Sequence, residues 1–339
     1  MARMRIKDIA EEAGVSPATV SRYLNNRPGQ MTDETRARIA EVIERTGYRP
    51  RTAARNLRSG RSHALGVLLA DIANPFSSAM LEELSVAAAD SGYSLMTAIS
   101  GNDAARETEA IARLVDAGVD GLVVNTCGGN DEAIARLAQR LPVVLLDRAV
   151  EADDIDLVTS NNAELIAALV NELHACGCES YCLVTEDSDT SPVRRTRADA
   201  FVKETERLGL AGRVVSLGED ASELDQIIVS AAGKKLGLIC VNGLVLLRFM
   251  SSLAKLGLVL PQGLRVATFD DYLWNDVLFG GITTAAQDTH AIAQKVIERL
   301  LVRVDASVDQ QGRGKSLPPQ RTEIPGHIIV RASTQGSVR

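Results

Sequence analysis

Polar side chains suited to gripping a small polar ligand stand directly after short apolar runs of the sequence. Runs such as Val-Val-Leu-Leu and Val-Ala-Thr-Phe precede them, and the clearest examples are Asn125, Asp147, Asn242 and Asp270. Carboxylates and amides bind a polyol through paired hydrogen bonds, and a fork-shaped guanidinium such as that of Arg197 binds a carboxylate or a phosphate. These residue types predict a binding site for a sugar-like molecule.

The elements that would position these groups follow from the apolar runs themselves. The runs are short and nearly continuous, helical stretches separate them, and they span residues 64–70, 93–99, 119–124, 142–146, 155–159, 181–185, 214–217, 236–241 and 264–269. This alternation is typical of parallel strands covered by helices on both faces. Two similar halves with a break near 147–160 predict two doubly wound α/β lobes, whose ligands bind outside the carboxyl ends of the strands. The structural alternative for each Asp or Asn is a helix cap or a turn.

The N-terminal stretch carries a different chemistry. Ile6, Ile9, Ala10 and Ala13 recur at helical spacing, Gly14 can end that helix, and Ser16-Pro17 can begin another. The spacing of a small residue, a turn glycine and an apolar residue at 10, 14 and 20 is typical of a helix-turn-helix. We expect the second helix to present four residues to a DNA major groove, namely Pro17, Ala18, Ser21 and Arg22. The alternative is a helical hairpin that binds nothing.

A third amphipathic helix should follow from Thr32, with Ile39, Val42 and Ile43 on its inner face, until Gly47-Tyr48-Arg49-Pro50 breaks it. Residues 51–62 are basic and rich in small side chains. A helix of this length is marginal alone in water, so this linker should order only when something holds it.

These residues together resemble the lactose/galactose repressor (LacI/GalR) family of bacterial transcription regulators. The matching motifs are I-K-D-I-A-x-x-A-G-V-S-x-x-T-V-S-R-x-L-N, T-x-E-T-R, G-Y-x-P and A-A-R-x-L, which cover about sixty residues in order. The resemblance implies a helix-turn-helix DNA-binding domain at 1–50 and a hinge helix at 51–62. It also implies an effector-binding and dimerisation domain at 63–339, with two lobes of the periplasmic-binding-protein type joined by three crossovers.

The resemblance implies a near-palindromic double-stranded operator read by a homodimer. The expected DNA-binding residues are Ser16, Pro17, Ala18, Thr19, Ser21, Arg22, Asn25, Arg51, Arg55 and Leu57. Arg22 suits guanine through its paired donors. Leu57 would wedge open a base step in the minor groove, or, as the alternative, pack against Tyr48.

The resemblance also implies an effector site. Its expected residues are Asn74, Phe76, Asn125, Asp147, Arg197, Asn242, Asp270 and Trp274. Trp274 could stack on a sugar or cover the subunit surface. The sequence departs from the family pattern at Gly243, at Asn161-Asn162 and at Ala200. Arg194, Arg195 and Arg197 carry more positive charge than a neutral sugar needs, which favours a sugar acid or a sugar phosphate as the effector.

Charge is distributed unevenly along the 339 residues. The formal net charge is −7, but residues 1–62 carry 13 Lys and Arg against 7 Asp and Glu, a net charge of +6, and the remainder is acidic. A basic head on an acidic body suits a chain that touches phosphates at one end only. With no membrane-length apolar run and no secretion-signal pattern, we expect a cytoplasmic protein without a disulfide framework.

Other chemistry has little support in the sequence. The run His174-x-Cys176-x-Cys178-x3-Cys182 fits no common zinc pattern, so we expect no metal. Nucleotide-binding motifs and nucleophile elbows are missing, and the histidines are scattered, so we expect neither a cofactor nor an enzyme. The resemblance implies a DNA-binding repressor of carbohydrate-utilisation genes, with effector-induced release favoured over co-repression. The alternative is a sugar-binding sensor module whose N-terminal helices contact protein.

Overall fold

The computed structural model describes residues 4–24, 31–48, 61–186, 191–218, 222–231, 233–260, 263–309 and 317–335. Contacts within the chain divide it into two units, Met1–Ser62 and His63–Arg339. Four of the expected DNA-binding residues lie outside the described residues, namely Asn25, Arg51, Arg55 and Leu57.

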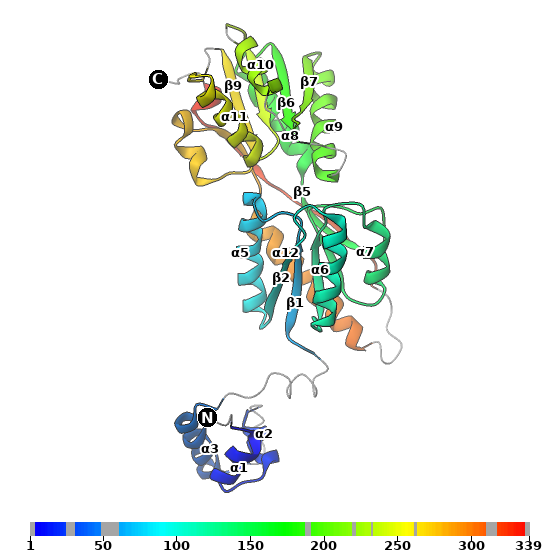
Figure 1. Ribbon diagram of the computed structural model, residues 1–339, viewed down its shortest axis with the longest axis vertical. Coiled ribbons are helices and arrows are strands. Elements are labelled where there is room, and N and C mark those ends of the chain that lie inside the picture. Colours follow the sequence, from blue (N-terminus) through cyan, green and yellow to red (C-terminus); the bar gives the residue numbers. More distant parts are fainter. Residues whose placement is uncertain are drawn as a thin grey trace. The chain divides into compact units, whose positions relative to one another are not determined.

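The first unit is built from α1 (Ile6–Glu12), α2 (Pro17–Leu24) and α3 (Asp33–Thr46) (Figure 1). Gly14 adopts φ +63° in the turn between α1 and α2, a conformation that glycine tolerates without strain. The Ser16 hydroxyl accepts a hydrogen bond from the Thr19 amide and so caps α2. The small apolar core contains the residues whose spacing predicted it: Ile9, Ala10, Ala13, Val20, Ile39 and Val42.

The first lobe of the second unit holds a sheet of parallel strands in the order β11-β5-β4-β3-β1-β2. Its strands are β1 (Ala64–Leu69), β2 (Ser94–Ile99), β3 (Gly121–Asn125), β4 (Val143–Leu146), β5 (Asp156–Ser160) and β11 (Arg321–Ile324). Its helices are α5 (Pro75–Asp90), α6 (Ala104–Asp116), α7 (Asp131–Ala138) and α12 (Thr289–Asp309). The core under α5 and α12 covers one face of the sheet, and the core under α6 and α7 covers the other.

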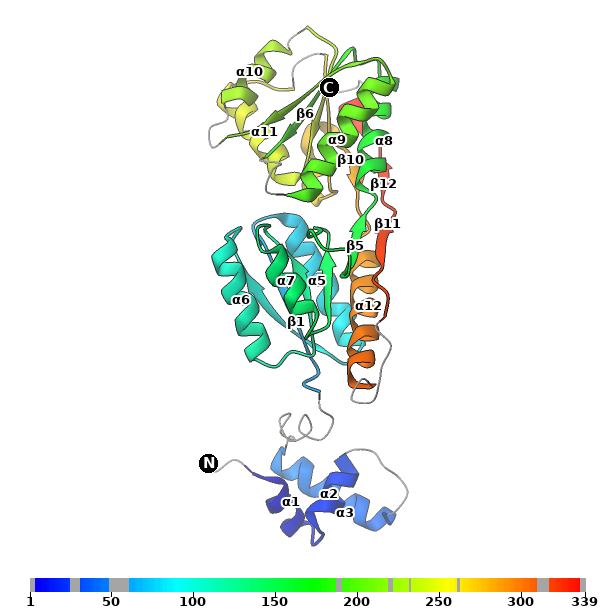
Figure 2. The same cartoon turned by 90° about the vertical axis from the view of Figure 1, so that its right-hand side faces the viewer.

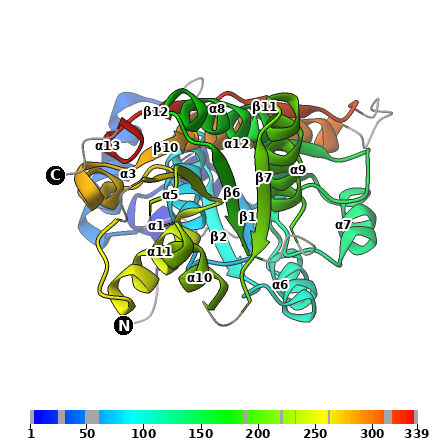
Figure 3. The ribbon, with the colours of Figure 1, turned by 90° about the horizontal axis from the view of Figure 1, so that it is seen from above.

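The second lobe repeats this plan with the order β12-β10-β9-β8-β6-β7, in which only β12 runs antiparallel to its described neighbour. Its strands are β6 (Ser180–Thr185), β7 (Ala211–Ser216), β8 (Leu236–Cys240), β9 (Leu264–Phe269), β10 (Thr283–Ala286) and β12 (His327–Ile329). Its α-helices are α8 (Asn162–Ala175), α9 (Pro192–Arg207), α10 (Ser222–Ser230), α11 (Gly243–Lys255) and α13 (Ala332–Gln335), and two short 3-10 helices are η1 (Leu273–Asp276) and η2 (Leu278–Gly280). Figure 3 shows α8 and α9 on one side of this sheet and α10 and α11 on the other.

Within the described chain, three segments cross between the lobes: β5 to α8, β10 to α12, and β11 to β12 (Figure 2). The predicted fold class, an N-terminal helix-turn-helix unit followed in sequence by two doubly wound lobes, is confirmed. The nine predicted strands are present, whereas β10, β11 and β12 were not predicted. Among the described residues, no helix combines the length and the apolar character needed to cross a membrane.

Candidate functional site

A pocket lies between the two lobes, at the carboxyl ends of strands from both sheets. Eleven residues line it: Asn74, Phe76, Asp147, Arg148, Ser191, Val193, Arg194, Arg197, Asn242, Asp270 and Gln287. Strand ends of both lobes therefore supply the polar groups, as expected for doubly wound sheets.

Asp147 and Asp270 occupy matching places in the two lobes. Each is the first residue after a strand, β4 or β9, and each has a left-handed backbone, with φ +64° and +72° respectively. Each donates its amide to the neighbouring strand, Asp147 to the Val158 carbonyl at 2.8 Å and Asp270 to the Ala285 carbonyl at 2.9 Å. A non-glycine residue in this region is strained, and such strain concentrates where a side chain has to be aimed at a ligand.

Burial raises the pKa of both the Asp147 and the Asp270 carboxyl groups, and the positive charge of Arg197 opposes the rise in each. Burial in turn lowers the pKa of the Arg197 guanidinium, against the attraction of these two carboxylates. Among the described residues, the buried Oδ1 atom of Asp147 has no hydrogen-bond partner. An unpaired buried carboxylate oxygen suits a ligand hydroxyl, because the ligand would satisfy it.

Arg197 of α9 is held rigidly where it faces the pocket. Its Nε donates to Asn162 Oδ1 at 2.7 Å, its Nη1 donates to the Val241 carbonyl at 2.8 Å, and its guanidinium stacks 3.5 Å from the ring centroid of Phe269. Only a planar guanidinium can stack and donate in this way.

Asn74 and Asn242 combine the capping role with a place in the pocket. Asn74 caps α5 by accepting from the Phe76 amide, and Asn242 caps α11 by accepting from the Val245 amide. The Asn242 amide also donates to Glu186 at 3.0 Å, and Glu186 pairs with Arg194 at 2.5 Å. The capping alternative is therefore correct, and it places both side chains at the pocket wall.

The structure gathers six of the eight expected effector residues and leaves two elsewhere. Asn125 is buried and donates to the Leu146 carbonyl at 3.0 Å, so it ties strand ends together outside the pocket lining. Trp274 packs against Tyr272 and the second-lobe core, so it does not offer its ring to a ligand in this pocket.

Sequence reasoning missed several lining residues. Gln287 follows β10, a strand of small and hydroxylated residues (Thr-Thr-Ala-Ala) that gave no strand signal. Arg148, the residue after Asp147, is buried and donates to the Thr126 carbonyl at 2.9 Å. The expected cluster of three arginines is wrong in one member, because Arg195 lies on the exposed side of α9 while Arg194 and Arg197 line the pocket.

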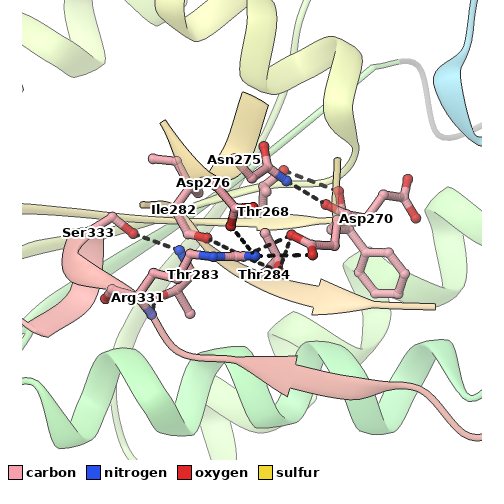
Figure 4. Close-up of polar contacts among 11 residues, drawn as sticks. Thr268, Asp270, Asn275, Asp276, Ile282, Thr283, Thr284, Arg331 and Ser333 are labelled. Atoms are coloured by element: carbon pink, nitrogen blue, oxygen red, sulfur yellow. Dashed lines mark hydrogen bonds and ion pairs between the residues drawn. The ribbon is translucent and has the colours of Figure 1, made fainter. Parts of the chain in front are cut away.

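The loop that follows Asp270 is anchored by the C-terminal segment. Arg331 donates to both carboxylate oxygens of Asp271 at 2.8 and 3.1 Å and pairs with Asp276 at 2.7 Å (Figure 4). Burial opposes ionisation of Asp271, but the hydrogen bond and charge of Arg331 and the hydrogen bond from Thr284 together outweigh it, and the pKa of Asp271 is lowered. Asn275 donates to the Asp270 carbonyl at 3.0 Å, so this anchored loop also holds the backbone of the pocket aspartate.

In the first unit, α2 presents Pro17, Ala18 and Arg22 as exposed residues, as its periodicity predicted. The expectation that Ser21 faces outward is wrong, because Ser21 is 8% exposed beside the core residue Val20. Ser16 is exposed and Thr19 is half-buried, and their hydroxyls hydrogen-bond to each other at 2.9 Å. The exposed face of α2 is therefore mostly apolar, and the guanidinium of Arg22 is its charged group.

The His-Cys run of α8 and β6 forms internal contacts. His174 Nδ1 lies 3.1 Å from the Tyr181 hydroxyl, and burial raises the pKa of Cys178 to about 11. In the part of the chain that the structure describes, no group of three or more His, Cys, Asp or Glu is placed to hold a metal ion.

Comparison with known proteins matches both units. Residues 5–51 match the model of bacterial regulatory proteins of the lacI family, and residues 62–228 match that of periplasmic binding proteins and the sugar binding domain of the LacI family. Residues 170–334 match a periplasmic binding protein-like domain. The chain is 37% identical to the HTH-type transcriptional regulator PtxS of Pseudomonas plecoglossicida, over 98% of this chain and 96% of that protein. It is 30% identical to the HTH-type transcriptional regulator KdgR of Bacillus subtilis, over 97% of each chain.

The fold has a counterpart among solved structures. The lac repressor dimer bound to operator and the anti-inducer ONPF superposes with a TM-score of 0.81 at 22% identity, covering 98% of this chain and 99% of that one. At this identity the likeness concerns the fold.

Proposed function

The chain belongs to the LacI family of DNA-binding transcriptional regulators, and we propose that it represses carbohydrate-utilisation genes under the control of a small sugar-type effector. The observation that carries the proposal is the convergence of Asp147, Asp270 and Arg197 on one pocket between the lobes, in a chain that also has a helix-turn-helix unit. The pocket offers hydrogen-bonding groups for a polyol and fits ligand binding without chemical conversion.

For the DNA, we assign the base-reading role to the exposed face of α2. Arg22 would donate both of its fork nitrogens to a guanine edge in the major groove. Pro17 and Ala18 have little hydrogen-bonding capacity and would read groove shape or thymine methyl groups. Ser16 and Thr19 would frame the helix against phosphates, and Asn25, Arg51, Arg55 and Leu57 keep the roles that the sequence suggested for them.

For the effector, we favour a sugar acid over a neutral sugar. Three guanidinium groups, those of Arg148, Arg194 and Arg197, line the pocket against the two carboxylates of Asp147 and Asp270. A carboxylate on the ligand would accept paired hydrogen bonds from one of these guanidinium groups, while its hydroxyls would engage Asp147, Asp270 and Asn242. A sugar phosphate shares this anionic chemistry and is the second candidate.

We propose a homodimer as the working state, because a near-palindromic operator read by one helix-turn-helix per chain requires two-fold symmetry. Apolar side chains exposed on the second unit support a second copy as the partner. They include Val86 and Met96 on the first lobe and Val259, Leu273 and Val277 on the second. Effector binding would change the angle between the lobes and so release the operator.

Calorimetry tests the effector class. The full chain is titrated with D-glucuronate and D-galacturonate, with the neutral sugars D-glucose and D-galactose, and with D-glucose 6-phosphate. We expect saturable binding of an acid and none of the neutral pair, because only the acid carries a carboxylate that the pocket guanidinium groups can bind by paired hydrogen bonds. Binding confined to the neutral sugars would refute the acid assignment. An Arg194→Gln variant should lose affinity for the acid selectively.

Electrophoretic shift with DNA from the chain's own promoter region tests the regulator. We expect a retarded complex whose affinity falls steeply with salt, because phosphate contacts release counterions. Equal affinity for promoter DNA and for scrambled DNA of the same length would refute sequence-specific binding.

A further inference from the structure

The pocket carboxylate Asp270 is linked by two hydrogen bonds to a crossover segment between the lobes. Gln287 donates its Nε2 to Asp270 Oδ1 at 2.5 Å, and its Oε1 accepts from the Ser160 hydroxyl at 2.5 Å. Gln287 belongs to the second crossover and Ser160 ends β5 at the first. One amide therefore joins a ligand-facing carboxylate to two of the segments on which the lobes move.

The pocket guanidinium reaches the same crossover by another route. Arg197 Nε donates to Asn162 Oδ1, and Asn162 Nδ2 donates to Thr159 Oγ1 at 3.2 Å and to the Ser160 carbonyl at 3.0 Å. Asp270 and Arg197 are thus both held by side chains that are hydrogen-bonded to residues 159 and 160.

Asn161, the residue after Ser160, connects the first crossover to the third. Asn161 Oδ1 accepts from the Gly326 amide at 2.9 Å, and Asn161 Nδ2 donates to Glu164 at 2.7 Å. An aspartate at 161 could accept from Gly326 but could not donate to Glu164, and it would add a like charge beside it. Asparagine at this place, a departure noted in the sequence, therefore suits a chain that carries Glu164.

We propose that Gln287 is a positioning residue that couples the state of Asp270 to the first crossover through Ser160. The amide has two ends with opposite roles, so its orientation is fixed only while the carboxylate accepts and the hydroxyl donates. A ligand hydroxyl that takes Asp270 Oδ1 competes with Gln287 Nε2. When the amide turns or withdraws, the Ser160 hydroxyl loses its acceptor, and the buried crossover must rearrange to replace it. This coupling rests on the proposed effector site, of which Asp270 is part.

Hydrogen–deuterium exchange of the full chain, without DNA or ligand, tests the coupling. We measure peptides covering residues 156–163 in the unaltered protein and in Asp270→Ala, Ser160→Ala and Gln287→Leu variants. Asp270→Ala should raise exchange in this segment at least fivefold, although the altered residue lies in the other lobe. In a Gln287→Leu background, Asp270→Ala should raise the exchange rate of residues 156–163 less than twofold, because the hydrogen-bonded link through Gln287 is already broken. If Asp270→Ala acted only by destabilising the fold, it would raise the exchange rate by the same factor with and without Gln287.

Internal and matched controls separate local from global effects. Peptides covering β8 report general loosening of the second lobe, and they should keep their exchange rates. Asn242→Ala changes another pocket residue of the same lobe that has no described bond to the crossover, and it should leave residues 156–163 unchanged. If Asp270→Ala also raises exchange in β8, the milder changes Ser160→Ala and Gln287→Leu provide the test. The coupling predicts that residues 156–163 exchange no faster in the Ser160→Ala, Gln287→Leu double variant than in Gln287→Leu alone.

Unchanged exchange at 156–163 in Asp270→Ala, or equal increases with and without Gln287, would overturn the coupling. Because neither DNA nor ligand enters the measurement, this failure would leave the proposed regulator function standing. Loss of promoter binding would equally leave the coupling untouched.

Discussion

Gly243 leaves the space that the ring of Tyr272 fills. A β-carbon at position 243 would lie 2.6 Å from Cε2 of Tyr272, closer than carbon atoms pack. Tyr272 stands two residues after the pocket aspartate Asp270 and stacks on Trp274. Gly243, one of the departures from the family pattern, is therefore the residue type that the Tyr272 ring requires at this position.

Gly243→Ala should push the Tyr272 ring away and disturb the Asp270 loop. Overpacking of this kind costs about 1–3 kcal/mol of unfolding free energy, and effector affinity should fall with it. Thermal unfolding and calorimetry measure the two effects. Gly218→Ala serves as the control, because a β-carbon there meets nothing within 4 Å. The clash account also predicts a smaller cost of Gly243→Ala in a Tyr272→Ala background, and equal costs in both backgrounds would speak against it.

Arg22→Ala should reduce discrimination between promoter DNA and scrambled DNA, because it removes the only charged side chain among the exposed α2 residues that we assign to base contacts. The expected loss is about 1–3 kcal/mol of specific binding free energy. Fluorescence anisotropy on both duplexes gives the ratio of affinities. Arg36→Ala removes the same charge from an exposed position of α3 and should leave that ratio unchanged. If Arg22→Ala leaves the ratio of promoter to scrambled affinity unchanged, Arg22 does not make the base contact that we assign to it.

Arg197→Lys should weaken effector binding at least tenfold, about 1.4 kcal/mol. A lysine ammonium cannot stack on Phe269 while donating to both Asn162 and Val241, so the charge would lose its fixed direction. Arg195→Lys, two residues away on the exposed side of the same helix, should bind the effector normally. Near-normal affinity of Arg197→Lys would show that charge alone suffices at this position.

Asp156 should make the first lobe sensitive to acid. Its carboxylate is fully buried and accepts from Arg299 at 2.8 Å, Arg303 at 2.5 Å and the Gln320 amide at 2.6 Å. Burial opposes ionisation, but the two arginines and the Gln320 backbone amide together outweigh it, and the pKa of Asp156 is lowered. A lowered pKa in the folded state adds stability above the ordinary carboxyl pKa, and this stability is lost as the pH falls through the lowered value.

Asp156→Asn should therefore cost about 3 kcal/mol of unfolding free energy at pH 7, with the difference from the unaltered protein shrinking below about pH 4. Urea unfolding followed by circular dichroism across this pH range measures it. Asp153→Asn, whose side chain is exposed beside Arg321, should change little at any pH. A cost for Asp156→Asn that persists undiminished at low pH would contradict the electrostatic explanation.

The pocket residues that follow strongly apolar strands could be predicted, because the end of such a strand is visible in the sequence. Asp147 and Asp270 follow β4 and β9, which are buried and strongly apolar, so their convergence followed from the rule for doubly wound sheets. Gln287 was missed because β10 is four residues of threonine and alanine, whose burial comes from the strands beside it rather than from its own hydrophobicity. Ser21 was misplaced because it sits at the boundary between the buried and exposed faces of α2, where periodicity alone cannot decide.

In the proposed regulator, occupancy of the lobe pocket sets the affinity of the helix-turn-helix unit for DNA. Fluorescence anisotropy of promoter DNA with the full chain, titrated with each hexuronate and each neutral sugar at fixed salt, tests this most directly. We expect selective binding of the promoter duplex, weakened at least tenfold by an acid sugar, with at least ten times more of the acid needed for the same effect in Arg197→Lys. Promoter affinity that stays constant across every sugar and acid that calorimetry shows to bind the protein would contradict the account.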